Sequence, residues 1–312
     1  MPARVRPAGA DPRVTSVVIT RNRQWEVQRA LGKLLESGDA SRVIVVDNAS
    51  TDRTAAIVRE RFPCVEVLGL RRNRGAAARN VGVRAAKTPY VAFSDDDSWW
   101  EPGSVRSAAD LLDRNPQLAL LAARILVGPH AAPDPNCSLM ASSPLRGFRL
   151  PGPAVLGFLA CGAVVRRAAF EGVGGFRAGW GVGGEEQLLA VDLLAAGHRL
   201  AYVPEITAHH HPAGHREHAA GRRTETLRND LWFAWLRRPL SGALRETART
   251  IAAARTDRDA RRAVLRSLAG SPWVICARRP ITRAVEREIR LLERQRRSAG
   301  RRRRERASVG VA

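Results

Sequence analysis

The sequence lacks several features that would place it in a membrane or give it a redox or zinc site. Its longest apolar stretch, residues 118–127, is interrupted by Arg124 and is far shorter than the roughly 20 apolar residues that a membrane span needs. Its first residues contain no apolar segment of the kind found in secretory signals. The four cysteines are far apart and form no CxxC pair, which argues against a zinc knuckle or a redox motif. We therefore expect a globular cytoplasmic protein that does not cross the membrane.

Positive charge is abundant and unevenly distributed. The 312 residues include 52 Lys+Arg and 30 Asp+Glu, and nearly all of the basic residues are arginine. From residue 212 onward there are 26 basic and 10 acidic residues, so this part carries most of the net charge of +22. The two parts of the chain therefore face different partners.

Apolar runs alternate with segments of helical spacing in the first part of the chain. The runs that predict strands are 14–20, 43–46, 65–70, 90–93 and 118–127, and the segments that predict helices are 24–36, 54–62, 75–86 and 104–114. This alternation predicts an α/β fold with a mostly parallel sheet and helices on both faces. Such sheets bind ligands at the carboxyl ends of their strands, where Asp47 and Asp95 lie.

The second part of the chain is less regular. A long surface connection is predicted at 128–153 and ordered structure resumes at 156–165. A glycine-dense stretch then leads to Glu185-Glu186, a predicted helix at 187–196 and a predicted strand at 199–203. Three histidines, His209 to His211, follow that strand. Beyond Pro212 the chain is predicted to be helical and rich in arginine.

Asp95, Asp96 and Asp97 follow the fourth predicted strand and precede Trp99 and Trp100. Adjacent carboxylates repel one another and need a cation to hold them together. Mg²⁺ or Mn²⁺ suits such oxygen ligands and brings the phosphates of a substrate with it. An isolated triplet of this kind is more often a solvated acidic turn. The two tryptophans fit either the core or a wall for a sugar ring.

Five separated motifs follow one another in a fixed order between residues 14 and 212. They are VIVVDNASTDRT (43–54), NRGAAARNVG (73–82), FSDDDSWW (93–100), VGGFRAGWGVGGEEQLLAVDLLAAG (173–197) and the histidine cluster after YVPE. Together they resemble the family-two inverting glycosyltransferases of the GT-A (Rossmann-like) fold. Members of that family transfer a sugar from a nucleotide diphosphate donor.

The resemblance implies a role for each motif. Asp47 would accept a hydrogen bond from a pyrimidine base, although it could instead merely cap the helix that follows. Asp95 and Asp97 fill the outer places of the D-x-D motif, and His210 fits the metal position better than its neighbours His209 and His211. The residues expected to contact the nucleotide sugar are Thr20, Asn22, Asp47, Asp52, Arg79, Asn80, Asp95 and Asp96, and those expected to hold Mn²⁺ or Mg²⁺ are Asp95, Asp97 and His210.

The fourth motif departs from the family, because its usual Glu-Asp is Glu185-Glu186 here. The chemistry asks for a carboxylate in this region, since an acceptor hydroxyl must lose its proton as it attacks the sugar. A divalent ion would neutralise the charge that develops on the leaving diphosphate. We expect Glu186 to be the base, with Glu185 as the alternative. A single displacement of this kind inverts the anomeric configuration.

The resemblance also divides the chain. We expect a disordered start (1–13), a GT-A domain (14–212) with a nucleotide-sugar half (14–127) and an acceptor half (154–212), a helical basic extension (213–299) and a disordered tail (300–312). Arginines alternate with apolar residues at 222–238 and 283–297, which predicts either helices that lie on an anionic membrane or a helical subdomain with a solvated basic face. No motif that reads DNA or RNA accompanies the charge, so we expect no specific nucleic-acid partner.

The expected function is metal-dependent transfer of a sugar from a UDP- or dTDP-sugar to a glycan or a lipid-linked acceptor, in the cytoplasm or peripherally at the inner face of the membrane. One alternative is a sugar-phosphate nucleotidyltransferase, but that class has a glycine-rich phosphate loop where this chain has TRNRQ at 20–24. The other alternative is an inactive scaffold that binds polyanions or membranes. The intact acidic residues argue against it.

Overall fold

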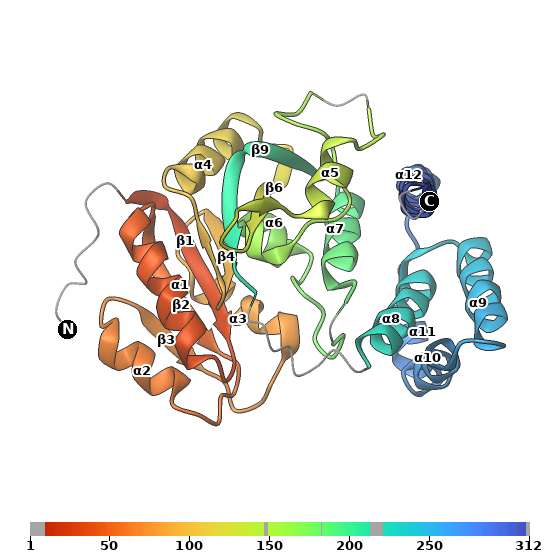
Figure 1. Ribbon diagram of the computed structural model, residues 1–312, viewed down its shortest axis with the longest axis horizontal. Helices are drawn as coiled ribbons and strands as arrows, with labels where there is room; N and C mark the ends of the chain where they lie inside the picture. The colour runs from red at the N-terminus through yellow and green to blue at the C-terminus, as the bar shows by residue number, and fades with distance from the viewer. Residues whose placement is uncertain (1–9, 147–148, 182, 213–220, 310–312) are drawn as a thin grey trace.

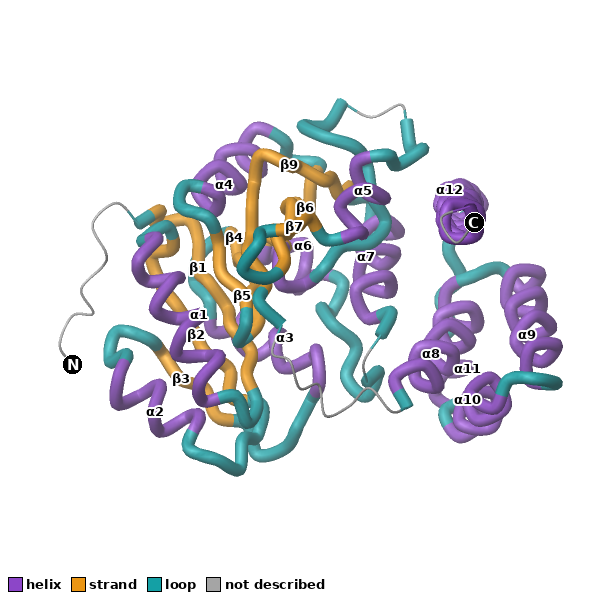
Figure 2. The backbone as a smooth tube through the Cα atoms, in the orientation of Figure 1, coloured by secondary structure: helices purple, strands orange, loops and turns teal. Residues whose placement is uncertain are grey.

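A computed structural model describes residues 10–146, 149–181, 183–212 and 221–309, with side chains described as far as Gln295 and at Ser298. The centre of the molecule is a nine-stranded sheet in the order β3-β2-β1-β4-β8-β6-β9-β5, with β7 paired to β6 (Figure 1). Helices cover the sheet, and a group of helices from the C-terminal part lies beside it (Figure 2). The architecture confirms the predicted α/β class with a C-terminal helical extension.

The strands and helices have the following bounds. The strands are β1 (Asp11–Thr20), β2 (Ala40–Asp47), β3 (Glu66–Gly69), β4 (Tyr90–Asp95), β5 (Ser98–Trp100), β6 (Leu118–Val127), β7 (Ala132–Pro133), β8 (Ala163–Arg166) and β9 (Arg199–His210). The helices are α1 (Gln24–Ser37), α2 (Thr54–Arg61), η1 (Gly75–Ala78), α3 (Arg79–Ala85), α4 (Ser104–Arg114), α5 (Pro135–Ala141), η2 (Ala160–Gly162), α6 (Arg167–Gly172), α7 (Glu185–Ala195), α8 (Arg222–Arg237), α9 (Leu240–Ala254), α10 (Arg258–Ala269), α11 (Ser271–Cys276) and α12 (Arg283–Val309).

The register of the first four strands brings their polar ends together. β3, β2, β1 and β4 pair in parallel, with Thr20 opposite Asp47 and Ile19 opposite Asp95. The parallel pattern predicted for this half is therefore confirmed. The other half is mixed, because β8 runs antiparallel to β4 and β6, whereas β6 and β9 are parallel. The carboxyl ends of β1, β2 and β4 meet at one edge of the sheet, as the Asp47 and Asp95 positions require.

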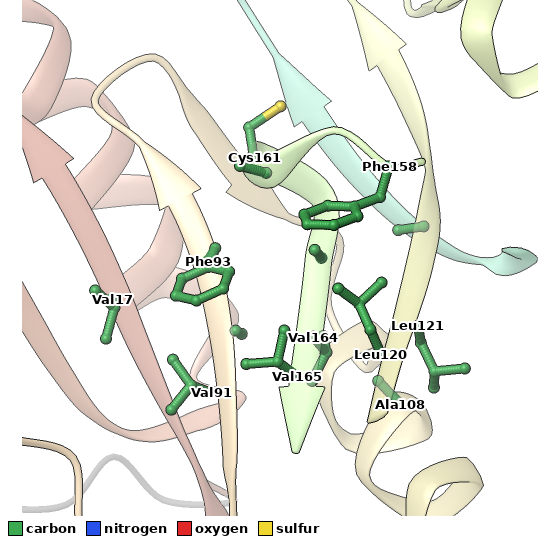
Figure 3. Close-up of a cluster of buried hydrophobic side chains, with 14 of the residues drawn as sticks. Val17, Val91, Phe93, Ala108, Leu120, Leu121, Phe158, Cys161, Val164 and Val165 are labelled. Atoms are coloured by element: carbon green, nitrogen blue, oxygen red, sulfur yellow. The ribbon is translucent and has the colours of Figure 1, made fainter. Parts of the chain in front are cut away.

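The main hydrophobic core lies on both faces of this sheet. Apolar side chains from β1, β4, β8 and β6 are buried in this core, and Figure 3 shows Val17, Val91, Val165 and Leu120 among them. Phe93 of β4 packs against Phe170 and Phe176, with ring centroids 5.6 and 5.9 Å apart. This packing fixes the end of β4, from which the aspartates extend.

A second hydrophobic core joins the C-terminal helices to the rest of the protein. Trp180 and Val191 are buried together with Trp232 and Leu236 of α8 and Ile289 of α12. An ion pair crosses this contact, because Arg237 Nη2 lies 3.0 Å from Asp192 Oδ2 of α7. A buried pair within the extension, Arg238 Nη2 with Glu286 Oε1 at 2.9 Å, joins the end of α8 to α12. The extension therefore shares its core with residues 154–212 and is not a detached appendage.

The predicted boundaries of the disordered start and of the disordered tail differ from those in the structure. The predicted disordered start is wrong for residues 11–13, because β1 begins at Asp11 and Arg13 Nη2 bonds Asp110 Oδ1 of α4 at 2.7 Å. The predicted disordered tail is wrong for residues 300–309, because α12 continues to Val309. Its run of arginine and glutamate contains no proline, and both residues favour helix. Residues 1–9 and 310–312 lie outside the described residues.

Two elements in the second half are longer or more ordered than predicted. The 128–153 segment contains α5, whose first turn is capped by Asp134 through a 2.8 Å bond from the backbone N–H of Asn136. Strand β9 continues to His210 and so carries two of the histidines within the sheet. In the part of the chain that the structure describes, no helix combines the length and apolar character that crossing a bilayer requires.

Candidate active site

A cavity of about 1010 Å³ opens where β1, β2 and β4 end. Its walls come from segments that are far apart in the sequence, including the start of α7 and the end of β9. Nine of the residues singled out from the sequence line it: Thr20, Asn22, Arg79, Asp95, Asp96, Asp97, Glu185, Glu186 and His210. The fold therefore places the candidate metal ligands and the candidate bases around one space.

Three predicted site residues do not line this cavity. Asp47 is buried at the end of β2 and accepts a 3.3 Å hydrogen bond from the backbone N–H of Ser50. Asp52 caps the following helix, because its Oδ1 accepts a 2.9 Å bond from the N–H of Thr54. Asp47 therefore does not cap that helix, and the contacts of Asp47 and Asp52 with the nucleotide stay predictions.

Asn80 is the third residue outside the cavity. Its amide forms two hydrogen bonds with the backbone of Phe176, donating to the carbonyl at 2.8 Å and accepting from the N–H at 2.9 Å. Both ends of the amide are therefore used in holding α3 against the glycine-dense segment. Asn80 therefore supports the segment beside the cavity, and its contact with the nucleotide stays a prediction.

Asp97 and His210 face each other across the pairing of β5 with β9. The antiparallel register sets Ser98 opposite His210, and His210 Nε2 lies 3.3 Å from Asp97 Oδ1. Successive side chains of a strand point to opposite faces. His209 accordingly turns away, contacts Glu101 and stacks on Trp99, with ring centroids 5.6 Å apart. Of the three histidines, His210 is therefore the one directed at the aspartates.

The two tryptophans after the aspartates have different surroundings. Trp100 is fully buried in the main core. Trp99 is half-buried and packs on His209 and on His211, whose ring centroid is 4.6 Å from that of Trp99. Neither tryptophan lines the cavity. The core alternative therefore holds for Trp100, and Trp99 supports the end of β9 from behind.

Asp95 is paired with Arg79 rather than with the other two members of the predicted metal set. Arg79 Nη2 contacts Asp95 Oδ1, and the guanidinium also lies over the ring of Phe176, 5.5 Å from its centroid. Among the described residues, no three His, Cys, Asp or Glu side chains converge closely enough to hold a metal ion. The protein groups that fit a metal here are one carboxylate and one imidazole, Asp97 and His210. That donor set suits Mn²⁺ and leaves most coordination positions for phosphate oxygens and water.

Crowded negative charge marks both walls of the cavity. Burial, followed by repulsion from Asp97 and Asp95, raises the pKa of Asp96 to about 7. Burial, followed by repulsion from Glu185, raises the pKa of Glu186 to about 8, and burial raises the pKa of Glu185 as well. A carboxyl group with a pKa near neutrality exchanges protons readily at physiological pH. These groups therefore have the electrostatics expected of a site for acid–base chemistry.

Several cavity residues have no counterpart in the expectations from sequence. Asn48 follows Asp47 and orders the neighbouring segment, since its Oδ1 accepts a 2.8 Å bond from the N–H of Arg74 and its amide donates to the Gly75 carbonyl at 3.2 Å. Cys161 lies at the turn before β8. Arg222 opens α8 and brings a positive charge from the basic extension. The asparagine after a strand end is a signal in the sequence, but Arg222 is brought here only by tertiary packing.

Comparison with known proteins identifies the family. Residues 15–174, just over half of the chain, match the family described as glycosyl transferase family 2. The chain belongs to glycosyl transferase family 2. The alternative of a sugar-phosphate nucleotidyltransferase is thereby dismissed.

Curated relatives of this family 2 protein include enzymes from Mycobacterium tuberculosis. A pre-mycofactocin glycosyltransferase (strain H37Rv) is 34% identical over 216 residues, which are 66% of this chain and 44% of that protein. An N-acetylglucosaminyl-diphospho-decaprenol L-rhamnosyltransferase is 27% identical over 272 residues, or 73% of this chain and 88% of that protein. Three other relatives are matched over only 35%, 30% and 29% of their own length, about a third.

Solved structures agree on the fold of the family 2 domain. A mannosyltransferase from Pyrobaculum calidifontis, in complex with GDP-Man and Mn²⁺, superposes with a TM-score of 0.55 at 21% identity and covers 85% of this chain and 72% of that one. S. aureus TarS residues 1–349, in complex with UDP-GlcNAc, gives a TM-score of 0.55 at 18% identity over 71% of this chain and 65% of that one. These similarities support the GT-A fold.

Proposed function

We propose that this family 2 glycosyltransferase is a metal-dependent, inverting enzyme that moves a sugar from a UDP- or dTDP-sugar to a glycan or a lipid-linked acceptor. The observation that carries the proposal is the arrangement of one cavity, with Asp97 and His210 on one wall and Glu185 and Glu186 on another. A diphosphate held at the first wall would present its sugar to an acceptor activated at the second. The solved relatives with GDP-Man and Mn²⁺ and with UDP-GlcNAc support a nucleotide-sugar donor.

The donor end of the cavity has groups suited to a nucleotide diphosphate. Thr20 ends β1, Asn22 follows two residues later, and both line the cavity together with Asp96. The Nε of Arg79 is buried without a hydrogen-bond partner among the described residues, and we assign that missing partner to a phosphate oxygen of the donor, which Arg79 would meet by turning into the cavity that it lines. Asp47, which holds Ser50 at the neighbouring strand end, is assigned to the recognition of the base.

Asp97 and His210 would hold the divalent ion, together with Asp95 if it separates from Arg79. When bound, a divalent ion stabilises the negative charge that develops on the leaving diphosphate. Release of Asp95 would also free the charge of Arg79 for the donor. These residues thus bind and orient the diphosphate on the side of the sugar opposite to the incoming acceptor.

Glu186 is assigned as the base, with Glu185 as the alternative. Both acids begin α7 and line the cavity, and one oxygen of Glu185 is buried without a hydrogen-bond partner among the described residues. Burial makes each carboxylate a stronger proton acceptor, as its raised pKa shows. The acid would take the proton of the acceptor hydroxyl as that oxygen attacks the anomeric carbon, and a single displacement leaves the sugar inverted.

The extension supports an acceptor that is presented at a membrane. Of the eight large apolar side chains that the described residues expose, seven lie in this part, among them Leu240, Leu244 and Ile251 of α9. These three recur at intervals of four and seven, so they form one stripe along the helix, and the exposed Arg245 and Arg249 lie farther round the same helix. We assign this face to an anionic bilayer surface. The matched relative that acts on a diphospho-decaprenol acceptor also supports an acceptor that is presented at a membrane.

The test is a transfer assay with the purified protein. Donors UDP-GlcNAc, dTDP-rhamnose and GDP-mannose are each supplied with Mn²⁺, Mg²⁺ or EDTA, and acceptors include short-chain polyprenyl-diphosphate sugars and soluble oligosaccharides. We expect metal-dependent release of nucleotide with one pyrimidine donor and a product whose anomeric configuration, read by NMR, is opposite to that of the donor. A product of retained configuration would refute inversion, and no turnover of any donor would favour the inactive scaffold.

A further inference from the structure

The glycine-dense loop before the candidate bases has few side chains that could fix its backbone conformation. Gly179, Gly181, Gly183 and Gly184 all have positive φ angles, between 78° and 96°. This backbone region is open to glycine and costly for other residues. Glycine also keeps the greatest freedom in the absence of contacts, so the position of this loop has to be fixed from outside. The loop ends at Gly184, and the next two residues are Glu185 and Glu186.

Helix α8 of the basic extension supplies these outside contacts. The side-chain amide of Asn229 donates to the carbonyl of Gly183 at 2.7 Å, and Nη2 of Arg228 donates to the carbonyl of Trp180 at 2.8 Å. The indole N–H of Trp180 donates to the same Gly183 carbonyl at 3.0 Å. Both ends of the loop are therefore tied to two consecutive residues of α8.

Asn229 and Arg228 are themselves held rigidly. The Oδ1 of Asn229 accepts hydrogen bonds from Nε and Nη2 of Arg228, at 3.1 and 2.9 Å, which directs its amide nitrogen to Gly183. The Arg228 guanidinium lies over the ring of Trp232, 4.3 Å from its centroid. Asn229 is only 1% exposed. A buried polar group with a fixed orientation sets the place of its partner far more tightly than a surface contact does.

We infer that Asn229 and Arg228 are positioning residues that hold Glu185 and Glu186 in place through the glycine loop, so the basic extension is a working part of the active site. The inference rests on the proposed function, because it assigns the base to these acids. The Gly183 carbonyl lies immediately before the first turn of α7, where both acids stand. A shift of this carbonyl therefore shifts the carboxylates relative to an acceptor hydroxyl. Misplacing a catalytic group by about 1 Å costs roughly 100-fold in rate.

The first experiment replaces the amide by an apolar side chain of the same branching and number of heavy atoms. In Asn229→Leu we expect kcat to fall by about 100-fold while the donor KM changes little, because the donor wall is untouched. The pH profile of kcat should also shift, since the environment of the acids changes. Arg223→Gln is the matched control on the same helix, because Arg223 is exposed and pairs with Asp257 of the turn before α10. It should retain full kcat.

The second experiment tests whether the effect passes through the acids. Asn229→Leu is combined with Glu186→Gln or Glu185→Gln, whichever proves the more damaging, and we expect no further loss of kcat in the double variant. The inference would be overturned if Asn229→Leu lowered kcat by the same factor in the wild-type protein and in the glutamine variant. It would also be overturned if folded Asn229→Leu had an unchanged kcat. If neither glutamine variant lowers transfer, the assignment of the base itself fails, which is a separate result. Should Asn229→Leu not fold, Arg228→Lys answers the same question, because it keeps the charge near Trp232 and removes the guanidinium geometry that bonds Trp180.

Discussion

The Nε2 atom of His210 lies 3.3 Å from Oδ1 of Asp97, and the antiparallel pairing of β5 with β9 produces this approach. The same pairing turns His209 to the other face, where it contacts Glu101. Two adjacent histidines thus have opposite surroundings, one in the cavity and one behind it. This difference allows the metal assignment to be tested with neighbouring substitutions.

We expect His210→Ala to remove metal-dependent transfer, or to raise sharply the Mn²⁺ concentration that transfer needs, because half of the preformed donor pair is lost. His209→Ala should have a much smaller effect, since its ring does not line the cavity. The measurement is a Mn²⁺ titration of transfer for both variants, with Asp97→Ala beside them. Full turnover of the wild-type protein in excess EDTA would contradict the metal assignment.

Glu186→Gln should preserve the size of the side chain and remove its ability to take a proton. We expect donor binding to survive and transfer to fall by about 100- to 10,000-fold, the range typical of the loss of a general base. Steady-state transfer and donor binding by calorimetry measure the two effects separately. If Glu185→Gln lowers transfer strongly and Glu186→Gln lowers it only slightly, the base is Glu185, the first acid of α7.

The raised pKa of Glu186 has a consequence for stability. Its folded pKa of about 8 lies above the ordinary value of 4.5, so between these pH values the folded state holds a proton that the unfolded chain has released. The stability of the wild-type protein should therefore decrease as pH rises through this window. Glu186→Gln cannot ionise and should lose less, so its Tm relative to wild type should increase from pH 4.5 to pH 8. Thermal unfolding in EDTA tests this, and two parallel curves would argue against an abnormal Glu186.

The proposed membrane face predicts a salt-sensitive interaction with anionic lipid. Binding to phosphatidylglycerol vesicles should weaken strongly between low and high salt, because each basic residue near the surface contributes about 1 kcal/mol and salt screens that attraction. Leu240→Gln with Leu244→Gln should weaken it further, and the two leucines are 59% and 58% exposed, so the fold should tolerate the changes. Vesicle flotation provides the measurement.

Trp25→Gln is the matched control for the membrane test, because Trp25 is 71% exposed but lies on α1, outside the extension. Substitutions are preferable to removal of the extension, since the second core loses Trp232, Leu236 and Ile289 when this part is cut away. Equal binding to neutral and anionic vesicles, or no binding to either, would favour the solvated basic face.

The first half of the fold could be predicted from local sequence because its signals are local. The apolar runs that became β1, β2 and β4 are largely buried, and the amphipathic spacing of α1 and α4 matches the sides that pack on the sheet. The second half departs more from prediction. Strand β8 joins the sheet antiparallel to β4, and the short strand β5 pairs with β9. Such pairings join segments far apart in the chain, so the local residue pattern of one strand does not specify them.

The candidate site was likewise predicted only in part. The resemblance of the five motifs to the family selected Asp95, Asp97, Glu185, Glu186 and His210, and the structure brings all five to one cavity. Asp52 and Asn80 were selected by the same pattern, yet the structure uses their side chains for a helix cap and a clamp on Phe176. Motif matching identifies a segment but does not determine which of its polar side chains points into the cavity.

The sequence by itself determined the family of this protein and the candidate groups of its site, since it contains the carboxylates, the histidine and the strand ends that place them at one edge of a sheet. Tertiary structure alone decided that Asp95 pairs with Arg79, that His210 rather than His209 faces Asp97, and that α8 reaches back to hold the loop before Glu185. The physical reason is that side-chain direction depends on strand register and helix packing. Both are set by the burial of apolar surface between segments far apart in the chain, which no local window of residues contains.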